Sequence, residues 1–134
     1  MRYIFTDIDG VLNPHWKKEW SKKSIDIFNR ICTDFSLIPI LTSTWRTKHS
    51  IEQMNQIFAE QGIIHKIVDF TPHLEDSFRG EEIQQWLDGN KWDRYVVVDD
   101  RVISIKPFIK NVVECRSWIG LEEEHYEQIK RMLK

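Results

Sequence analysis

The chain has 134 residues and a mass of 16.2 kDa, which is the usual size of one domain, so we expect a single domain over residues 1–134. Its 19 basic and 21 acidic residues leave a formal net charge of -2, which argues against nucleic-acid binding by bulk electrostatics and leaves only a local basic patch for that role. With 41% hydrophobic and 30% charged residues, the composition is that of a globular domain and excludes a disordered or fibrous chain.

The longest apolar runs fall far short of the roughly 20 residues that a membrane-spanning helix needs. Asp7 interrupts the first apolar segment where a secretory signal would still be apolar. We therefore expect neither a membrane span nor a signal peptide. The two cysteines, Cys32 and Cys115, have the spacing of neither a disulfide framework nor a zinc site, so we expect a cytoplasmic protein in a reducing compartment.

Short apolar strands alternate with amphipathic helices along the whole chain. The periodicity predicts, in chain order, strand 2–6, helix 21–35, strand 36–42, helix 47–62, strand 63–70, helix 79–90, strand 94–100, strand 111–116 and helix 121–134. This alternation predicts right-handed βαβ units, and hence an α/β fold with a doubly wound parallel sheet in three α/β/α layers. Ligands of such sheets bind at the carboxyl ends of the strands.

Two pairs of acidic residues follow predicted strands. Asp7 and Asp9 come after the first strand, and Asp99 and Asp100 end the strand at 94–100. Both pairs should lie at one edge of the sheet, where four carboxylates would repel one another unless a cation lies among them. Because hard oxygen ligands suit Mg²⁺, the sequence predicts a magnesium site.

Two further features at this edge suggest a phosphate site. Gly10 directly follows Asp9 and permits a tight turn in which a ligand approaches backbone N–H groups. Thr42 ends another predicted strand with a hydroxyl at the same edge.

Four segments then resemble the ordered motifs of the haloacid dehalogenase (HAD) superfamily: DIDGVLN (7–13), ILTSTWR (40–46), RGEEIQQWL (79–87) and VVVDDR (96–101). The chain looks most like the small HAD-like domains associated with "Swiss Army knife" RNA-repair proteins. The resemblance covers nearly the whole chain and implies a HAD-like (Rossmannoid) fold with phosphatase activity.

By position, the resemblance makes Asp7 the nucleophile that forms an aspartyl-phosphate, and Asp9 the general acid and later the general base. It also implies Mg²⁺ held by Asp7, by the backbone carbonyl of Asp9, and by Asp99 or Asp100.

The resemblance further implies that Thr42 hydrogen-bonds a phosphoryl oxygen. The third motif of the family usually offers a lysine. Here Arg79 is the best-placed cation, with Lys66 as a weaker substitute, and its guanidinium would neutralise charge on the phosphoryl oxygens.

Each of these assignments has a structural alternative. Asp7 and Asp9 would also suit a strand-to-helix turn, and one of Asp99 and Asp100 would suit a structural role that orients Arg79 or Arg101. Ser43 offers a second phosphate-binding hydroxyl beside Thr42, or else caps the following helix.

A substrate rim is predicted from residues next to the first two motifs. Trp16, Lys17 and Lys18 belong to a basic and aromatic segment (16–23) on which a nucleotide base would stack, although the same segment would serve as a solvated helix start with Trp20 in the core. Trp45 and Arg46 follow the second motif, and Arg46 would either bind a second phosphate or pair with a carboxylate. The histidines show no ligand spacing, and only His15 is expected near the site.

The stretches 13–36 and 47–78 are too short to hold the cap domain that usually covers a HAD site. An open site favours a phosphate on a large molecule, such as an RNA or DNA end or a nucleotide, with the substrate, a partner or a homodimer completing the enclosure. Two rival functions remain: a small-molecule or nucleotide 5′-phosphatase completed by dimerisation, and a non-catalytic module that binds phosphorylated ends.

Overall fold

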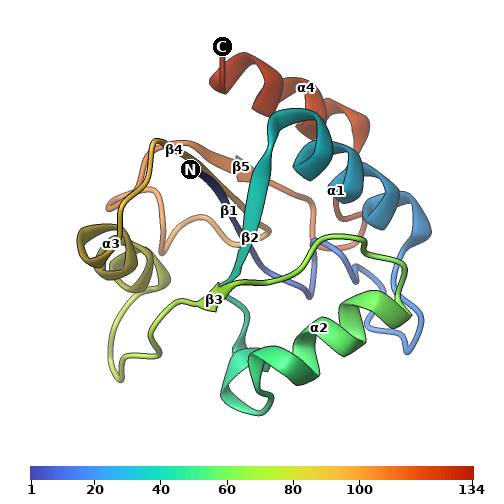
Figure 1. Cartoon of the computed structure of the whole chain (residues 1–134), viewed down its shortest axis with the longest axis horizontal. Helices are drawn as coiled ribbons and strands as arrows, with labels where there is room; N and C mark the ends of the chain where they lie inside the picture. Colours follow the sequence, from blue (N-terminus) through green and yellow to red (C-terminus); the bar gives the residue numbers. More distant parts are fainter.

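Strands and helices alternate along the computed structural model, which describes residues 1–134 (Figure 1). The elements are β1 (Arg2–Thr6), α1 (Lys22–Phe35), β2 (Leu37–Leu41), the short 3₁₀ helix η1 (Thr44–Thr47), α2 (Ile51–Glu60), β3 (Asp69–Phe70), α3 (Arg79–Gly89), β4 (Arg94–Asp99), β5 (Val112–Glu114) and α4 (Glu123–Met132). The five strands form one sheet in the order β3-β2-β1-β4-β5, and every neighbouring pair is parallel. The predicted doubly wound α/β fold is therefore confirmed.

The two faces of the sheet are covered by different helices. Successive residues of a strand point to opposite faces. In β4, Val96 and Val98 pack with residues of α1, α2 and α4, whereas Val97 packs with α3 and the segment that follows β4. Figure 1 shows α3 alone on one side of the sheet, with α1 and α4 together on the other. This arrangement gives the three predicted layers.

The strand predicted at 63–70 is shorter than expected, because only Asp69 and Phe70 pair with β2. The carbonyl of Pro39 in β2 faces this edge and accepts from Val68, but proline has no N–H to continue the ladder. The side chain of Asn55 instead bonds both the N–H and the carbonyl of Ile67. The preceding backbone is thus held by a side chain rather than by strand pairing.

The helix predicted at 47–62 is also divided. The 3₁₀ helix η1 ends at Thr47, and α2 begins only at Ile51. Ser50 caps α2: its hydroxyl accepts from the Gln53 N–H while the Gln53 side chain accepts from the Ser50 N–H. The capping box sets the start of α2 and leaves η1 as a separate turn next to the carboxyl end of β2.

The connections leave the carboxyl edge of the sheet uncovered by a further domain. Between β1 and β2 the chain forms a loop and α1, and between β2 and β3 it forms η1 and α2. As the sequence predicts, these connections contain no cap domain. No helix has the length and apolar character needed to cross a membrane.

Candidate active site

Three carboxylates meet where β1 and β4 end side by side. Thr6, the last residue of β1, pairs with Val98, so that Asp7 emerges next to Asp99. Oxygen atoms of Asp7, Asp99 and Asp100 lie within 4.8 Å of one another. The predicted gathering of acids at this edge is present, except that the Asp9 side chain is not part of this group.

Arg79 faces the acids from the first turn of α3. Its Nη1 lies 3.1 Å from Asp7 Oδ2 and 2.8 Å from Asp99 Oδ2. The start of α3 can approach this closely because Gly80 packs against the backbone of Ser104 and Ile105, where a Cβ would lie 2.9 Å from each carbonyl oxygen. Arg79 is therefore the cation that contacts Asp7, and Lys66 lies elsewhere, in a surface cleft with Asn55 and Ile64.

The charges at this site influence one another strongly. Burial raises the pKa of Asp7 against the opposing charge of Arg79. Burial, followed by the charge of Asp7, raises the pKa of Asp99 to about 7. Burial alone would lower the pKa of Arg79, but Asp7 and Asp99 outweigh it and raise that pKa. The clustered acids therefore favour further positive charge nearby.

Asp99 and Asp100 have different surroundings. Asp99 is fully buried; its Oδ2 accepts from Arg79 and its Oδ1 accepts from the Arg101 N–H. Asp100 borders an open cleft, and its Oδ2 accepts from the Ser117 hydroxyl. Asp99 thus orients Arg79 and Arg101, as one of the two sequence interpretations allows, while Asp100 is the acid that is open to a ligand.

The open cleft in front of these acids has a volume of about 190 Å³. It is lined by Asp7, Asp9, Trp16, Thr44, Arg79, Asp100 and Arg101. We call it the central cleft. Its size suits a small group such as phosphate, and its lining combines three carboxylates with two arginine side chains.

Gly10 has a backbone conformation that leaves room for the Asp100 carboxylate beside the central cleft. Its φ is +83°, and a Cβ built on it would lie 2.2 Å from Asp100 Oδ2. The glycine was predicted to let a ligand approach the backbone; what the structure shows is that it makes room for the Asp100 carboxylate.

The hydroxyl residues after β2 are placed differently from one another. Thr42 is fully buried and its hydroxyl donates to the Thr6 carbonyl, while the Ser43 hydroxyl caps η1 by accepting from the Trp45 N–H. Neither residue lines the central cleft. Thr44, which sequence reasoning missed, lines it instead. The turn into η1 moves the reachable hydroxyl two residues along the chain.

Asp9 lies at the boundary between the central cleft and a second cleft. Its Oδ2 accepts from the indole N–H of Trp45 at 3.1 Å. The second cleft is lined by Asp9, Thr44, Trp45, Thr47, Lys48 and His49 and has a volume of about 330 Å³. We call it the η1 cleft. His49 is a second residue that sequence reasoning missed, because only His15 was expected near the site.

The predicted basic and aromatic rim is present only in part. Trp16 is 70% exposed and lines the central cleft, whereas Lys17 and Lys18 are exposed but line none of the clefts around the acids. Trp20 is a core residue packed edge-to-face on Trp45 and Phe58.

Arg46, predicted either to bind a second phosphate or to pair with a carboxylate, lines neither the central cleft nor the η1 cleft. Its side chain is buried, with its N–H groups donating to the carbonyls of Thr42, Ser43 and Thr71. Its Nη2 pairs with the buried carboxylate of Glu82 at 2.9 Å. The alternative of a carboxylate partner is the one observed, and the partner comes from α3 rather than from the four acids.

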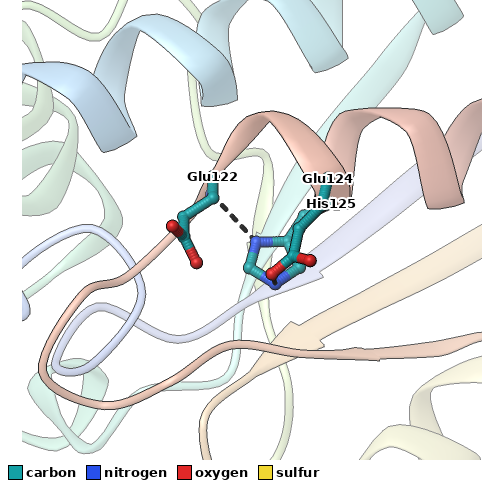
Figure 2. A group of neighbouring side chains, drawn as sticks. All are labelled: Glu122, Glu124 and His125. Carbon is teal, nitrogen blue, oxygen red and sulfur yellow. Dashed lines mark hydrogen bonds and ion pairs between the residues drawn. The ribbon is translucent and has the colours of Figure 1, made fainter.

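A second group with acidic side chains, Glu122, Glu124 and His125, lies at the start of α4 (Figure 2), and none of its residues lines the clefts around the first group. There the Glu122 N–H donates to His125 Nδ1 at 2.9 Å. Arg116 pairs with Glu122 and Glu124, and Lys23 pairs with Glu122. These cations already neutralise the acids. The contact between Glu122 and His125 caps the helix.

A parallel sheet whose switch point between β1 and β4 carries clustered acids facing an arginine, with no covering domain, defines a HAD-like domain. The family model of the HAD domain in Swiss Army Knife RNA repair proteins matches residues 3–126, and the chain belongs to this family. The resemblance predicted from the four motifs is confirmed. A comparison with curated proteins finds no match.

Proposed function

We propose that this protein is a Mg²⁺-dependent phosphomonoesterase that works through an aspartyl-phosphate on Asp7 and acts on phosphorylated nucleic-acid ends or nucleotides. The observation that supports this proposal is the central cleft, whose lining includes the carboxylates of Asp7, Asp9 and Asp100 together with Arg79 and Arg101. Membership of a HAD family named for RNA-repair proteins supports both the reaction class and the substrate class.

The proposed reaction has two steps. In the first, a carboxylate oxygen of Asp7 attacks phosphorus, the bond to the leaving oxygen breaks, and Asp9 gives its proton to that oxygen. In the second, Asp9 removes a proton from water, the water oxygen attacks phosphorus, and the bond to Asp7 breaks to release phosphate. Arg79 neutralises charge on the phosphoryl oxygens throughout.

The residues of the site fit a magnesium ion. Mg²⁺ prefers oxygen donors with room for water, and Asp7 and Asp100 both reach the open central cleft. Asp7, Asp100 and the backbone carbonyl of Asp9 would hold the ion, with Asp99 behind them. When bound, Mg²⁺ would screen the negative charges of the nucleophile and the phosphate from each other.

The open site supports a phosphate carried by a large molecule. The connections after β1 and β2 form no cap, so a long chain can leave the central cleft without meeting a covering domain. The substrate itself then excludes part of the water from the reacting groups.

The test is phosphate release from nucleotides and from 3′- or 5′-phosphorylated oligonucleotides, measured with Mg²⁺ and with a chelator. We expect release to require Mg²⁺, and we expect Asp7→Asn to lower kcat by about a thousandfold or more because it removes the nucleophile. Circular dichroism serves as the control that this variant is folded.

Two results would contradict the proposal. Wild-type activity in folded Asp7→Asn would rule out Asp7 as the nucleophile. Tight binding of phosphorylated ends with no release from any substrate would instead favour a non-catalytic binding module.

A further inference from the structure

The η1 cleft is not used by the reaction as written above, although it adjoins the proposed acid. Apart from Asp9, all of its lining residues come from η1 and the two residues that follow it. Asp9 and Thr44 line both this cleft and the central cleft, so the two clefts meet at these residues. A ligand whose phosphate occupies the central cleft can therefore extend into the η1 cleft.

Chemistry indicates which part of a substrate enters there. A general acid must lie within hydrogen-bonding reach of the oxygen to which it gives its proton. The indole N–H of Trp45 donates to Oδ2 of Asp9 and holds this carboxyl in the wall of the η1 cleft. A third cleft, beyond Arg79 and lined also by His73 and Ser104, does not include Asp9. The leaving group consequently belongs in the η1 cleft.

The walls of the η1 cleft suit a planar, polar ring. The rings of Trp45 and His49 stack with centroids 5.5 Å apart and an interplanar angle of 24°. His49 Nδ1 lies 3.0 Å from the Trp45 carbonyl, and because a carbonyl only accepts, Nδ1 carries the proton. Nε2 is the ring nitrogen left to contact a polar group of the ligand.

We propose, on the basis of the proposed function, that the η1 cleft binds the nucleoside next to the scissile phosphate, with its base against the Trp45–His49 pair. The volume of about 330 Å³ lies near the lower end of ligand pockets, which run from about 300 to 1,000 Å³. The cleft therefore has room for one nucleoside, and the remaining nucleotides of a strand would lie outside it. The exposed Lys48 adds a cation that suits the next phosphodiester.

The test measures binding apart from turnover. Equilibrium dialysis of Asp7→Asn with Mg²⁺ compares adenosine 5′-monophosphate and adenosine 3′-monophosphate with ribose 5-phosphate and inorganic phosphate. We expect at least one of the two nucleotides to bind about tenfold more tightly than ribose 5-phosphate, because base stacking contributes on this scale.

Variants at His49 test whether the difference in affinity between nucleotides and ribose 5-phosphate arises in the η1 cleft. In the Asp7→Asn background, His49→Ala should weaken nucleotide binding about five- to tenfold and leave ribose 5-phosphate binding unchanged, since only the base contact is lost. His49→Phe keeps a ring for stacking and should retain most of the affinity. The matched control is His65→Ala, because His65 bonds Thr33 away from the clefts around the acids.

The outcomes separate this inference from the proposed function. Equal binding of nucleotides and ribose 5-phosphate, or no effect of His49→Ala, would overturn the nucleoside site even if the wild-type enzyme releases phosphate. Base-dependent binding that His49→Ala removes would support the site even if no substrate is hydrolysed.

Discussion

At the scale of single residues, Gly10 shows how a backbone conformation positions the acids. The φ of +83° disfavours any other residue, and a Cβ at this position would meet Oδ2 of Asp100, the oxygen that accepts from the Ser117 hydroxyl. We predict that Gly10→Ala displaces Asp100 and raises the Mg²⁺ concentration for half-maximal phosphate release about tenfold or more, the range seen when groups that orient metal ligands are lost.

Gly89 provides the matched control for this substitution. It ends α3, its φ is not positive, and a Cβ there would meet nothing within 4 Å. Gly89→Ala should leave the Mg²⁺ dependence unchanged and stabilise the protein by about 0.5–1 kcal/mol in thermal unfolding. Equal Mg²⁺ dependence in the two variants would show that Gly10 does not set the position of Asp100.

Trp45 is a positioning residue for Asp9. Trp45→Phe keeps a ring against Trp20 but removes the indole N–H that holds Asp9 Oδ2. We predict that kcat for a nucleotide falls about tenfold, with a smaller loss for p-nitrophenyl phosphate, because its phenolate leaves with little help from an acid. The readout is the ratio of the two kcat values, which a general loss of stability would leave unchanged.

At the scale of elements, the start of α4 is sensitive to pH. His125 is only 3% exposed, and its Nδ1 caps the helix by accepting from the Glu122 N–H. Burial lowers the pKa of His125 below its usual 6.5, although Glu124 and Glu122 oppose the shift. Protonation of Nδ1 would remove the cap.

The sign of the pH effect follows from this shift. Below about pH 6.5 the unfolded chain takes up a proton at His125 before the folded chain does, so the free energy of unfolding should fall as pH falls through this range. We predict that His125→Gln weakens this acid-side loss, because glutamine can accept the same N–H and does not titrate. Urea unfolding of both proteins from pH 7.5 to 5 measures the difference, and parallel pH dependences would contradict the assignment.

The helices and strands also show which parts of the fold are determined by local sequence. Most strands and helices follow from periodicity, because β1, β4 and α1 bury continuous or one-sided apolar surfaces. The start of α2 was missed although its capping box, Ser50 to Gln53, is present in the sequence. The short β3 depends on Pro39 and Asn55, which act across the sheet edge and leave no periodic signal.

In the candidate site, too, some features follow from local sequence and others depend on contacts between residues distant in sequence. Asp7, Asp99 and Asp100 meet because they end neighbouring parallel strands, so strand order alone brings them together. Arg46 turns inward because Glu82, on a helix distant in sequence, binds it. His49 lines the same cleft as Asp9 because η1 and the two residues after it form the wall of that cleft. Neither the Arg46–Glu82 pair nor the shared cleft has a sequence pattern that reveals it.

At the scale of the whole molecule, the clustered acids and Arg79 lie at one open edge of the sheet, while the net charge of the chain is slightly negative. Under the proposed function, long-range attraction for nucleic acid has to come from a local patch. Exposed Lys17 and Lys18 follow Trp16, which lines the central cleft. These lysines line none of the clefts around the acids, so they can act only on phosphates beyond the reacting one.

Because the two lysines lie outside the clefts, we predict that kcat/KM depends on substrate length and on salt concentration. A phosphorylated oligonucleotide should have a higher kcat/KM than its mononucleotide, and the advantage should shrink as salt rises, because backbone contacts release counterions. For the oligonucleotide, log(kcat/KM) should fall with log[salt], and Lys17→Ala combined with Lys18→Ala should make this negative slope shallower by about 1.4, or about 0.7 for each lost contact with a single strand. The mononucleotide should be hydrolysed as before. Equal kcat/KM for both substrates without salt dependence would instead make this segment a solvated helix start and favour a small-molecule phosphatase.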